Sequence, residues 1–249
     1  MTGHEYLAGV LDNQKMQGED LITLRQLRKE IEGVLREEYG SYPRFYYAGS
    51  YGKKTMIRAS FDLDIVIYFP PTETSTLKTI YSFVHQTLID ADYKVHPKTV
   101  SLQLPYEGGF HIDVVPGRAQ DNTYQYATLY KNGENSTMQT SIKIHIDSVR
   151  DSRDIIKLMK LWRVCHSLEW KTFALEQTVV RALKGQRKND YERCLIKVFE
   201  FFQDNILTIR LVDPANSNNV IEMSQQIRES VQQAAINAIA AKYWSEVVW

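Results

Sequence analysis

The spacing of apolar positions along the 249-residue chain predicts a mixture of strands and helices. Across residues 19–39 an apolar side chain recurs every three or four positions, which places these side chains on one face of a helix. Residues 61–69 instead alternate polar and apolar positions before an apolar run, which is typical of a strand. By the same rules we expect further strands at 43–48, 99–104 and 110–115, and further helices at 77–91, 170–183, 191–207, 223–248 and from about residue 151.

Segments rich in turn residues separate these elements. Residues 70–76 (PPTETST) and 106–109 (YEGG) favour turns, and residues 117–147 read as mostly loop. The first fifteen residues have a weaker pattern, that of a short helix or a loose arm. The order of elements predicts an α+β fold, with a mixed β-sheet lobe and a helical C-terminal lobe that share a cleft. We place the sheet lobe, braced by an N-terminal helix, at residues 1–150 and the helical lobe at 151–249.

Composition is that of an ordinary globular protein, with 43% hydrophobic and 24% charged residues. The 30 basic and 30 acidic residues cancel, so no overall positive charge favours nucleic acid as a partner, although a local basic groove is still compatible with this balance. The two cysteines form no CxxC pattern, which argues against a structural zinc site. No apolar run has the length of a membrane span and residues 1–30 lack a signal-peptide pattern, so we expect a cytoplasmic protein without a membrane partner.

Two carboxylates in the second predicted strand carry the main chemical signal. Asp62 and Asp64 project to the same face, because residues two apart in a strand point the same way. Carboxylate oxygens suit a hard divalent cation such as Mg²⁺, which often arrives with phosphate. Gly49-Ser50 lies just upstream, and a glycine lets backbone amides approach a phosphate closely. Alone, an Asp-x-Asp is more typical of a solvated strand edge, so the ordered combination is what indicates a triphosphate site.

The segment GSYGKKTMIRASFDLDIVI resembles the signature of the polymerase-beta-like nucleotidyltransferase superfamily, in which a Gly-Ser pair precedes a D-x-D strand. It is most similar to the branch that contains CD-NTases, oligoadenylate synthases and cyclic GMP-AMP synthase. The resemblance extends over about residues 44–220. It implies that the active-site cleft lies between the sheet lobe and a helical lobe of the oligoadenylate synthase type.

The resemblance also implies a third carboxylate on a neighbouring strand. The segment HIDVVPGR supplies it as Asp113. Asp62, Asp64 and Asp113 would be both the catalytic residues and the metal ligands, holding two Mg²⁺ ions, or Mn²⁺ as an alternative, about 3.5–4 Å apart. Asp113 would lie nearer the attacking hydroxyl and help to accept its proton. His111 is more simply interpreted as a strand histidine beside the site than as a ligand.

A nucleotide-binding set follows from the same resemblance. Gly49 and Ser50 would bind the phosphates of the donor nucleotide. The helix KLMKLWR is similar to one whose lysine contacts the donor triphosphate, which assigns that contact to Lys160. In WKTFALEQ, Thr172 would contact the phosphates and Phe173 would stack on the base. On spacing alone, Lys160 is equally compatible with a solvated surface and Phe173 with the core.

The implied activity is Mg²⁺-dependent joining of nucleoside triphosphates into a cyclic or short oligonucleotide signal, with release of pyrophosphate. In the resembled family such signals act on a downstream effector in antiphage defence. One alternative is a template-independent RNA-tailing enzyme of the CCA-adding or poly(A) type; another is a catalytically silent protein that binds nucleotide or RNA. The absence of net positive charge makes RNA the less favoured acceptor, and retention of all three carboxylates argues against a silent protein.

Overall fold

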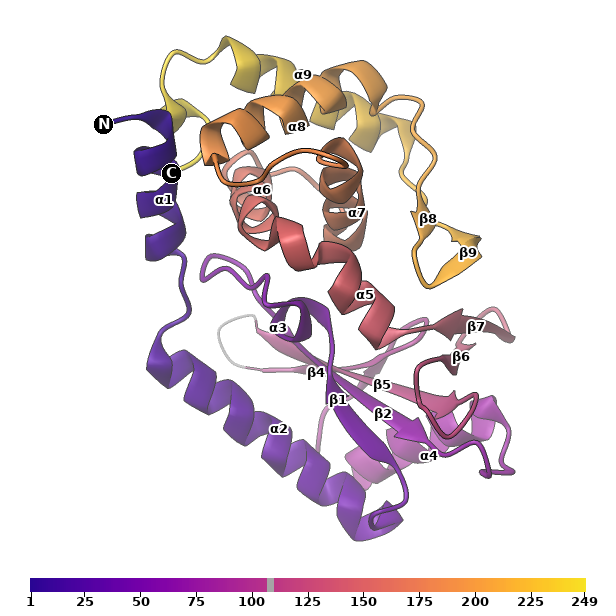
Figure 1. Ribbon diagram of the computed structural model, residues 1–249. Helices are drawn as coiled ribbons and strands as arrows, with labels where there is room; N and C mark the ends of the chain where they lie inside the picture. The colour runs from indigo at the N-terminus through magenta and orange to yellow at the C-terminus, as the bar shows by residue number, and fades with distance from the viewer. Residues whose placement is uncertain (107–109) are drawn as a thin grey trace. The chain divides into compact units, whose positions relative to one another are not determined.

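The computed structural model describes residues 1–106 and 110–249 (Figure 1). Residues 107–109 of the expected YEGG turn therefore lie outside the described residues. The described chain divides into two compact units, each built from segments that are distant in sequence. We call them the sheet unit (Met16–Lys54 and Phe61–Ile146) and the helical unit (Met1–Lys15, Thr55–Ser60 and Asp147–Trp249).

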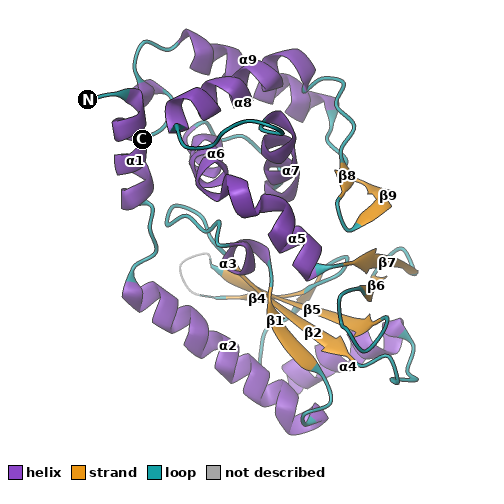
Figure 2. Ribbon diagram, in the orientation of Figure 1, coloured by secondary structure: helices purple, strands orange, loops and turns teal. Residues whose placement is uncertain are grey.

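The sheet unit is built on a mixed β-sheet, as the sequence predicts (Figure 2). Its strands follow the order β1-β2-β5-β4-β3, and β6 and β7 continue as a hairpin from β5. The two central strands, β2 and β5, run parallel, whereas the other pairs are antiparallel. The strands are β1 (Arg44–Tyr47), β2 (Leu63–Phe69), β3 (His96–Pro97), β4 (Leu102–Pro105), β5 (His111–Ala119), β6 (Ala127–Lys131) and β7 (Ser136–Thr140).

In the described part of this unit, three helices lie wholly within it: α2 (Gly18–Tyr39), α3 (Gly49–Lys53) and α4 (Leu77–Asp90). The apolar side chains of β2 explain why it is central, since Leu63 and Ile65 are fully buried. Helix α4 packs against β5 and β6, and α2 packs against α4, which agrees with the bracing role expected for the helix at 19–39.

The helical unit contains α1 (Gly3–Asn13), α6 (Arg153–Cys165), α7 (Thr172–Ala182), α8 (Tyr191–Asn205) and α9 (Gln225–Ala240). It also holds the short hairpin of β8 (Val212–Asp213) and β9 (Asn216–Val220), and the 3₁₀ turns Arg150–Ser152 and Trp244–Glu246. Large apolar side chains build its core. Trp162, Trp170, Phe199 and Phe202 pack ring against ring at the centre.

The expectation of loop across residues 117–147 was wrong. Strand β5 continues to Ala119, the β6–β7 hairpin follows, and α5 (Ile142–Val149) begins before the segment ends. The hairpin escapes an apolar-pattern search because Ser136–Thr140 is rich in Thr and Ser and much of it is accessible to solvent. Its turn is nevertheless encoded, since Gly133 has a φ of 84°.

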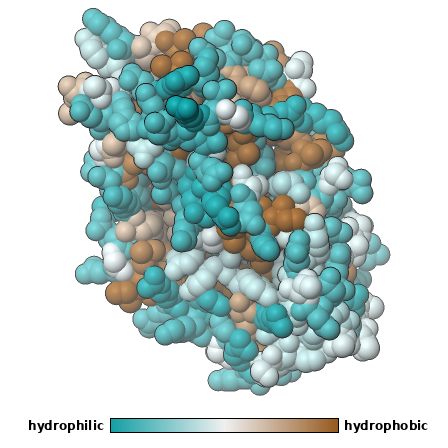
Figure 3. Space-filling model, viewed as in Figure 1, coloured by the Kyte–Doolittle hydropathy of each residue, from teal (hydrophilic) through white to brown (hydrophobic). Residues whose placement is uncertain are grey.

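The division into units differs in detail from a single break at residue 150. The helical segment begins at Asp147, within α5, and two earlier segments join it. The N-terminal helix α1 contributes Leu7 to the helical core, because its apolar face needs a partner. In the described part of the chain, no helix is both long and apolar enough to cross a membrane. On the face shown in Figure 3, hydrophobic residues lie in separate small patches.

Candidate active site

The sheet unit brings the predicted carboxylates together at its two parallel strands. Strands β2 and β5 pair in a register that sets Asp64 directly beside Asp113. Asp113 therefore lies on the strand that pairs with the strand of Asp64. Asp62 was expected to lie within the second strand, but β2 begins at Leu63, one residue after it. Its side chain is correspondingly more exposed, at 42%, than that of Asp113, at 19%.

The Asp64 carboxyl has a strongly perturbed pKa. Burial raises the pKa of Asp64 to about 7, and the negative charge of Asp113 adds to this rise. The positive charge of Lys53 opposes it, while Asp62 contributes a smaller increase to the same pKa. Two carboxylates held side by side in a dry setting resist joint ionisation. The site therefore favours either a bound proton or an added cation.

His111 joins the two outer carboxylates. Its Nδ1 lies 2.9 Å from Asp62 Oδ1 and its Nε2 lies 3.3 Å from Asp113 Oδ2. A doubly protonated imidazole would donate a hydrogen bond to each carboxylate. His111, which the sequence analysis interprets as a neighbouring strand residue, is therefore part of the carboxylate cluster. The signal for it was the shared strand face with Asp113, two residues away.

The carboxylate oxygens of Asp62, Asp64 and Asp113 are suitable ligands for divalent cations by their chemistry, but their present spacing suits a cation less well. Asp113 Oδ1 is buried and has no hydrogen-bond partner within residues 1–106 and 110–249, which is costly for a carboxylate oxygen. Burial and the negative charge of Asp113 make the neighbouring Asp64 resist ionisation. Among the residues that the structure describes, no group of three His, Cys, Asp or Glu side chains stands close enough to hold a metal as it is. Rotation of the Asp62 and Asp113 carboxylates away from His111 would free oxygen ligands for a hard cation.

The glycine-serine turn lies against the same carboxylates. Helix α3 begins at Gly49, whose φ of 49° falls in the left-handed region that favours glycine. A Cβ at this position would lie 1.6 Å from Asp64 Oδ2, so no other residue fits without movement. The amide of Ala48 donates to the Asp64 carbonyl at 3.0 Å. The turn that would hold phosphate is thus fixed beside the carboxylate that would hold its counter-ion, and Ser50 follows it in α3.

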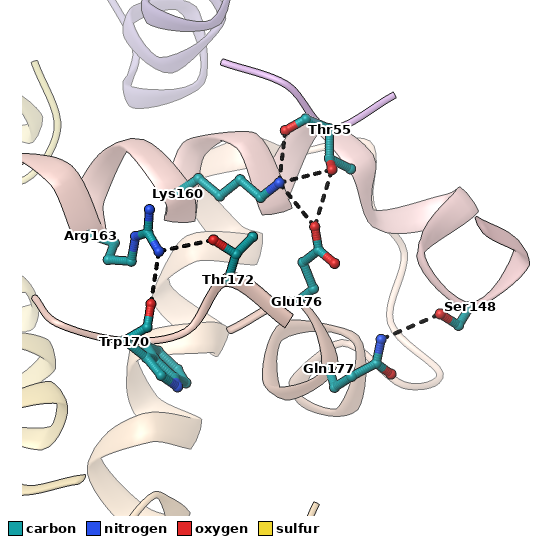
Figure 4. Close-up of polar contacts among 8 residues, drawn as sticks. All are labelled: Thr55, Ser148, Lys160, Arg163, Trp170, Thr172, Glu176 and Gln177. Carbon is teal, nitrogen blue, oxygen red and sulfur yellow. Dashed lines mark hydrogen bonds and ion pairs between the residues drawn. The ribbon is translucent and has the colours of Figure 1, made fainter. Parts of the chain in front are cut away.

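The other three expected site residues, Lys160, Thr172 and Phe173, belong to the helical unit. Figure 4 shows Lys160 and Thr172 with their polar contacts. Lys160 on α6 is only 4% exposed, and its ammonium contacts Glu176 Oε1 at 2.9 Å. Thr172, at the start of α7, accepts a hydrogen bond of 2.9 Å from Arg163 Nη1. Phe173 beside it is half-buried. Their contacts with a nucleotide stay predictions, and the buried position of Lys160 is unlike the solvated alternative.

Glu176 is a further residue that the sequence search missed. It is 1% exposed, and a buried carboxylate needs a partner of opposite charge or several hydrogen bonds. The available signal was its setting in FALEQTVV, where the neighbouring positions are mostly apolar. A charged side chain on the apolar face of a helix indicates either a site or a buried ion pair.

A mixed sheet with parallel central strands, three clustered carboxylates and a left-handed glycine turn against them is the arrangement of a polymerase-beta-type nucleotidyltransferase. The chain belongs to the family of Second Messenger Oligonucleotide or Dinucleotide Synthetase domains, whose model matches residues 1–152. This confirms the predicted relation to the CD-NTase branch and the enzyme class of nucleotidyltransferase.

Similar proteins agree with this placement. A cyclic AMP-AMP-AMP synthase of Escherichia coli (strain MS 115-1) is 22% identical over 258 residues, which cover 86% of this chain and 80% of the relative. The structure of E. coli MS115-1 CdnC with ATP matches this chain with a TM-score of 0.75 and 20% identity. The matched residues cover 96% of this chain and 91% of the CdnC chain. The CD-NTase CdnG of Bradyrhizobium diazoefficiens, in complex with GTP, matches with a TM-score of 0.75 at 14% identity. The matched residues cover 94% of this chain and 89% of the CdnG chain.

Proposed function

We propose that this protein joins nucleoside triphosphates into a cyclic or short oligonucleotide, with release of pyrophosphate. The observation that carries the proposal is the pairing of Asp64 with Asp113 across two parallel strands, beside a glycine turn that leaves no room for a side chain. A solvated strand edge would have no need of such a turn, nor of a carboxylate whose pKa is raised to about 7.

The proposed reaction is an in-line displacement. The hydroxyl oxygen of the acceptor nucleotide forms a bond to the α-phosphorus of the donor. The bond from that phosphorus to the oxygen bridging to the β-phosphate breaks, and pyrophosphate leaves with the electron pair. We assign the role of proton acceptor to Asp113, as the family resemblance implies, and from there the hydroxyl proton passes to water. A further transfer closes a ring: the terminal hydroxyl oxygen of the linear product bonds to the α-phosphorus of its own 5′-triphosphate, the bond from that phosphorus to the bridging oxygen breaks, and another pyrophosphate leaves.

Asp62, Asp64 and Asp113 would hold two divalent cations, which we propose to be Mg²⁺, with Mn²⁺ as a substitute. When bound, these ions stabilise the charge on the departing pyrophosphate and lower the pKa of the attacking hydroxyl. The unpartnered Oδ1 of Asp113 and the mutual repulsion of Asp64 and Asp113 support this proposal, because a cation relieves both.

Contacts with the donor nucleotide are proposed for four residues. Gly49 and Ser50 present backbone amides to the phosphates. Thr172 offers its hydroxyl to the same phosphates, and the half-buried ring of Phe173 stacks on the base. Lys160, the fifth expected member, already directs its ammonium to Glu176 and Thr55 within the helical unit.

ATP is the favoured substrate, because the curated relative of this chain is named for a product made of three adenylate units. Since nucleoside triphosphates are cytoplasmic metabolites, the proposal places the enzyme in the cytoplasm. Its product would act as a signal on a separate effector protein, and antiphage defence is the role we infer for that signal from the family resemblance.

An assay with and without RNA separates this function from RNA tailing. Nuclease-treated protein is incubated with α-³²P-labelled ATP, the other three nucleoside triphosphates and Mg²⁺, and total RNA is added to half of the samples. We expect labelled small products that resist phosphatase, in equal amounts in both halves and none with Asp113→Asn. Label found only on RNA would replace this function by tailing, and no product with any substrate would favour a silent binding protein.

A further inference from the structure

The six residues Thr55–Ser60 form a segment whose place in the fold differs from its place in the sequence. In the sequence they connect the glycine turn, which ends at Lys53, to Asp62 and Asp64. Both of those neighbours belong to the sheet unit, whereas the segment itself packs within the helical unit. These residues are therefore part of the covalent connection between the phosphate turn and the carboxylate strand.

Apolar burial and backbone hydrogen bonds fix the far end of the segment. Ile57 is fully buried in the apolar core of the helical unit. The amide of Arg58 donates to the Gln14 carbonyl at 3.1 Å, and the amide of Ala59 donates to Gln14 Oε1 at 3.0 Å. The segment is thus held by contacts that are specific in direction, which a merely covering loop would not require.

A buried polar cluster fixes the near end (Figure 4). Thr55 is fully buried, and the ammonium of Lys160 donates to its carbonyl oxygen at 3.1 Å and to its Oγ1 at 3.0 Å. The Thr55 hydroxyl in turn donates to Glu176 Oε1 at 3.2 Å, and the same carboxylate oxygen lies 2.9 Å from Lys160 Nζ. Each of the three side chains contacts the other two.

Stability alone is a poor explanation for this cluster. A buried ion pair gains little over apolar residues of similar size, because desolvation of both charges offsets their attraction. The ion pair does fix an orientation, because its charged groups hydrogen-bond to the hydroxyl and the carbonyl of Thr55 and hold both in place. Charge-assisted hydrogen bonds of this kind are short and geometrically demanding.

We propose that Lys160 and Glu176 are positioning residues, which act through Thr55 to align the phosphate turn with the catalytic carboxylates. The proposal rests on the proposed function for its kinetic test, and it gives Lys160 a role other than direct contact with the triphosphate. Alignment of this kind matters most in the transition state, where donor phosphate, acceptor hydroxyl and carboxylates must be in line.

Thr55→Val is the sharpest variant, because it removes the hydroxyl and leaves Lys160 and Glu176 in place. We expect kcat to fall about tenfold or more, while KM for ATP and Kd for α,β-methylene ATP stay within about twofold. Thr55→Ser retains the hydroxyl and should restore kcat. Thr178→Val is the matched control, since Thr178 is equally buried and its hydroxyl donates only to the Ala174 carbonyl of its own helix. A Thr55→Val enzyme with unchanged kcat would contradict the proposal.

A second variant separates positioning from phosphate contact. Replacing both charges, as Lys160→Met with Glu176→Leu, avoids leaving one buried charge without its partner and should fold. If Lys160 and Glu176 act by positioning, the kcat of this double variant should fall as it does in Thr55→Val. Its affinity for α,β-methylene ATP should stay unchanged. A Kd raised tenfold or more by the double variant but not by Thr55→Val would assign Lys160 to the triphosphate instead.

Hydrogen exchange tests the anchoring without any turnover. Amides of Thr55–Ser60 should exchange faster in Thr55→Val than in wild type or in Thr178→Val, with α9 unchanged in all three. An inactive wild-type protein would contradict the proposed function alone. Unchanged exchange in Thr55–Ser60 would contradict the positioning role alone.

Discussion

Replacing Asp64 by asparagine should stabilise the metal-free protein at alkaline pH while abolishing its activity. Burial and the charge of Asp113 raise the pKa of Asp64 from 3.8 to about 7. An acid whose pKa is raised by folding makes the protein most stable below pH 4, and that stability is lost as the pH rises through 7. A shift of about three pKa units corresponds to roughly 4 kcal/mol as an upper value. An asparagine side chain has no charge to desolvate, so this cost disappears in the variant.

The assay is urea denaturation of both proteins in EDTA between pH 4 and pH 8. Far-UV circular dichroism is the suitable signal, because the tryptophans Trp162, Trp170, Trp244 and Trp249 all lie in the helical unit and would not report on β2. The gain in unfolding free energy of Asp64→Asn over wild type should be near zero at pH 4 and grow towards about 4 kcal/mol at pH 8. Added Mg²⁺ should reduce this difference in unfolding free energy, because it should stabilise the wild type and not Asp64→Asn.

Asp90→Asn is the control for this experiment. Asp90 is an exposed carboxylate at the end of α4 in the same unit, so its replacement should change the unfolding free energy little, and equally at every pH. A difference between Asp64→Asn and wild type that does not vary with pH would refute the electrostatic reasoning. So would an Asp64→Asn protein that is less stable than wild type at pH 8.

Three further substitutions test the site. Gly49→Ala should abolish turnover, because the new Cβ would meet Asp64 Oδ2 at 1.6 Å; Gly133→Ala, with a similarly positive φ but open space around it, should keep activity. Asp113→Asn should stop pyrophosphate release without lowering the melting temperature, and near-normal release would remove Asp113 from the catalytic set. Phe173→Ala should weaken ATP binding by about 1–3 kcal/mol if the ring stacks on the base. A lower melting temperature with unchanged ATP affinity would place the Phe173 ring in the core instead.

The centre of the fold was predictable because its signals are local. The apolar run of β2 and the alternating pattern of β5 define two strands, and the two-residue period of a strand places Asp64 and Asp113 on defined faces. The glycine at position 49 was predictable for a related reason, since only a glycine adopts its backbone conformation without strain. These features depend on a few adjacent residues, which a sequence displays directly.

Features that depend on distant contacts were not predictable. The bridge from His111 to Asp62 requires the register of two strands that are far apart in the chain. The ion pair of Lys160 with Glu176 requires the packing of α6 on α7, so the apolar neighbours of Glu176 in the sequence could indicate burial but not its partner. The polar β6–β7 hairpin was not predicted for a different reason. Its strands pair through backbone hydrogen bonds, and their polar side chains give no periodic pattern of apolar residues in the sequence.

The most direct test of the central claim is to identify the products of the pure protein by mass spectrometry. Wild type, Asp64→Asn and Asp113→Asn are incubated with all four nucleoside triphosphates and Mg²⁺, without RNA. We predict, from the wild-type reaction alone, an oligonucleotide whose mass equals the summed mass of its nucleoside triphosphates less one pyrophosphate for each bond formed. Four unconsumed triphosphates in the wild-type reaction, with Mg²⁺ and again with Mn²⁺, would contradict it.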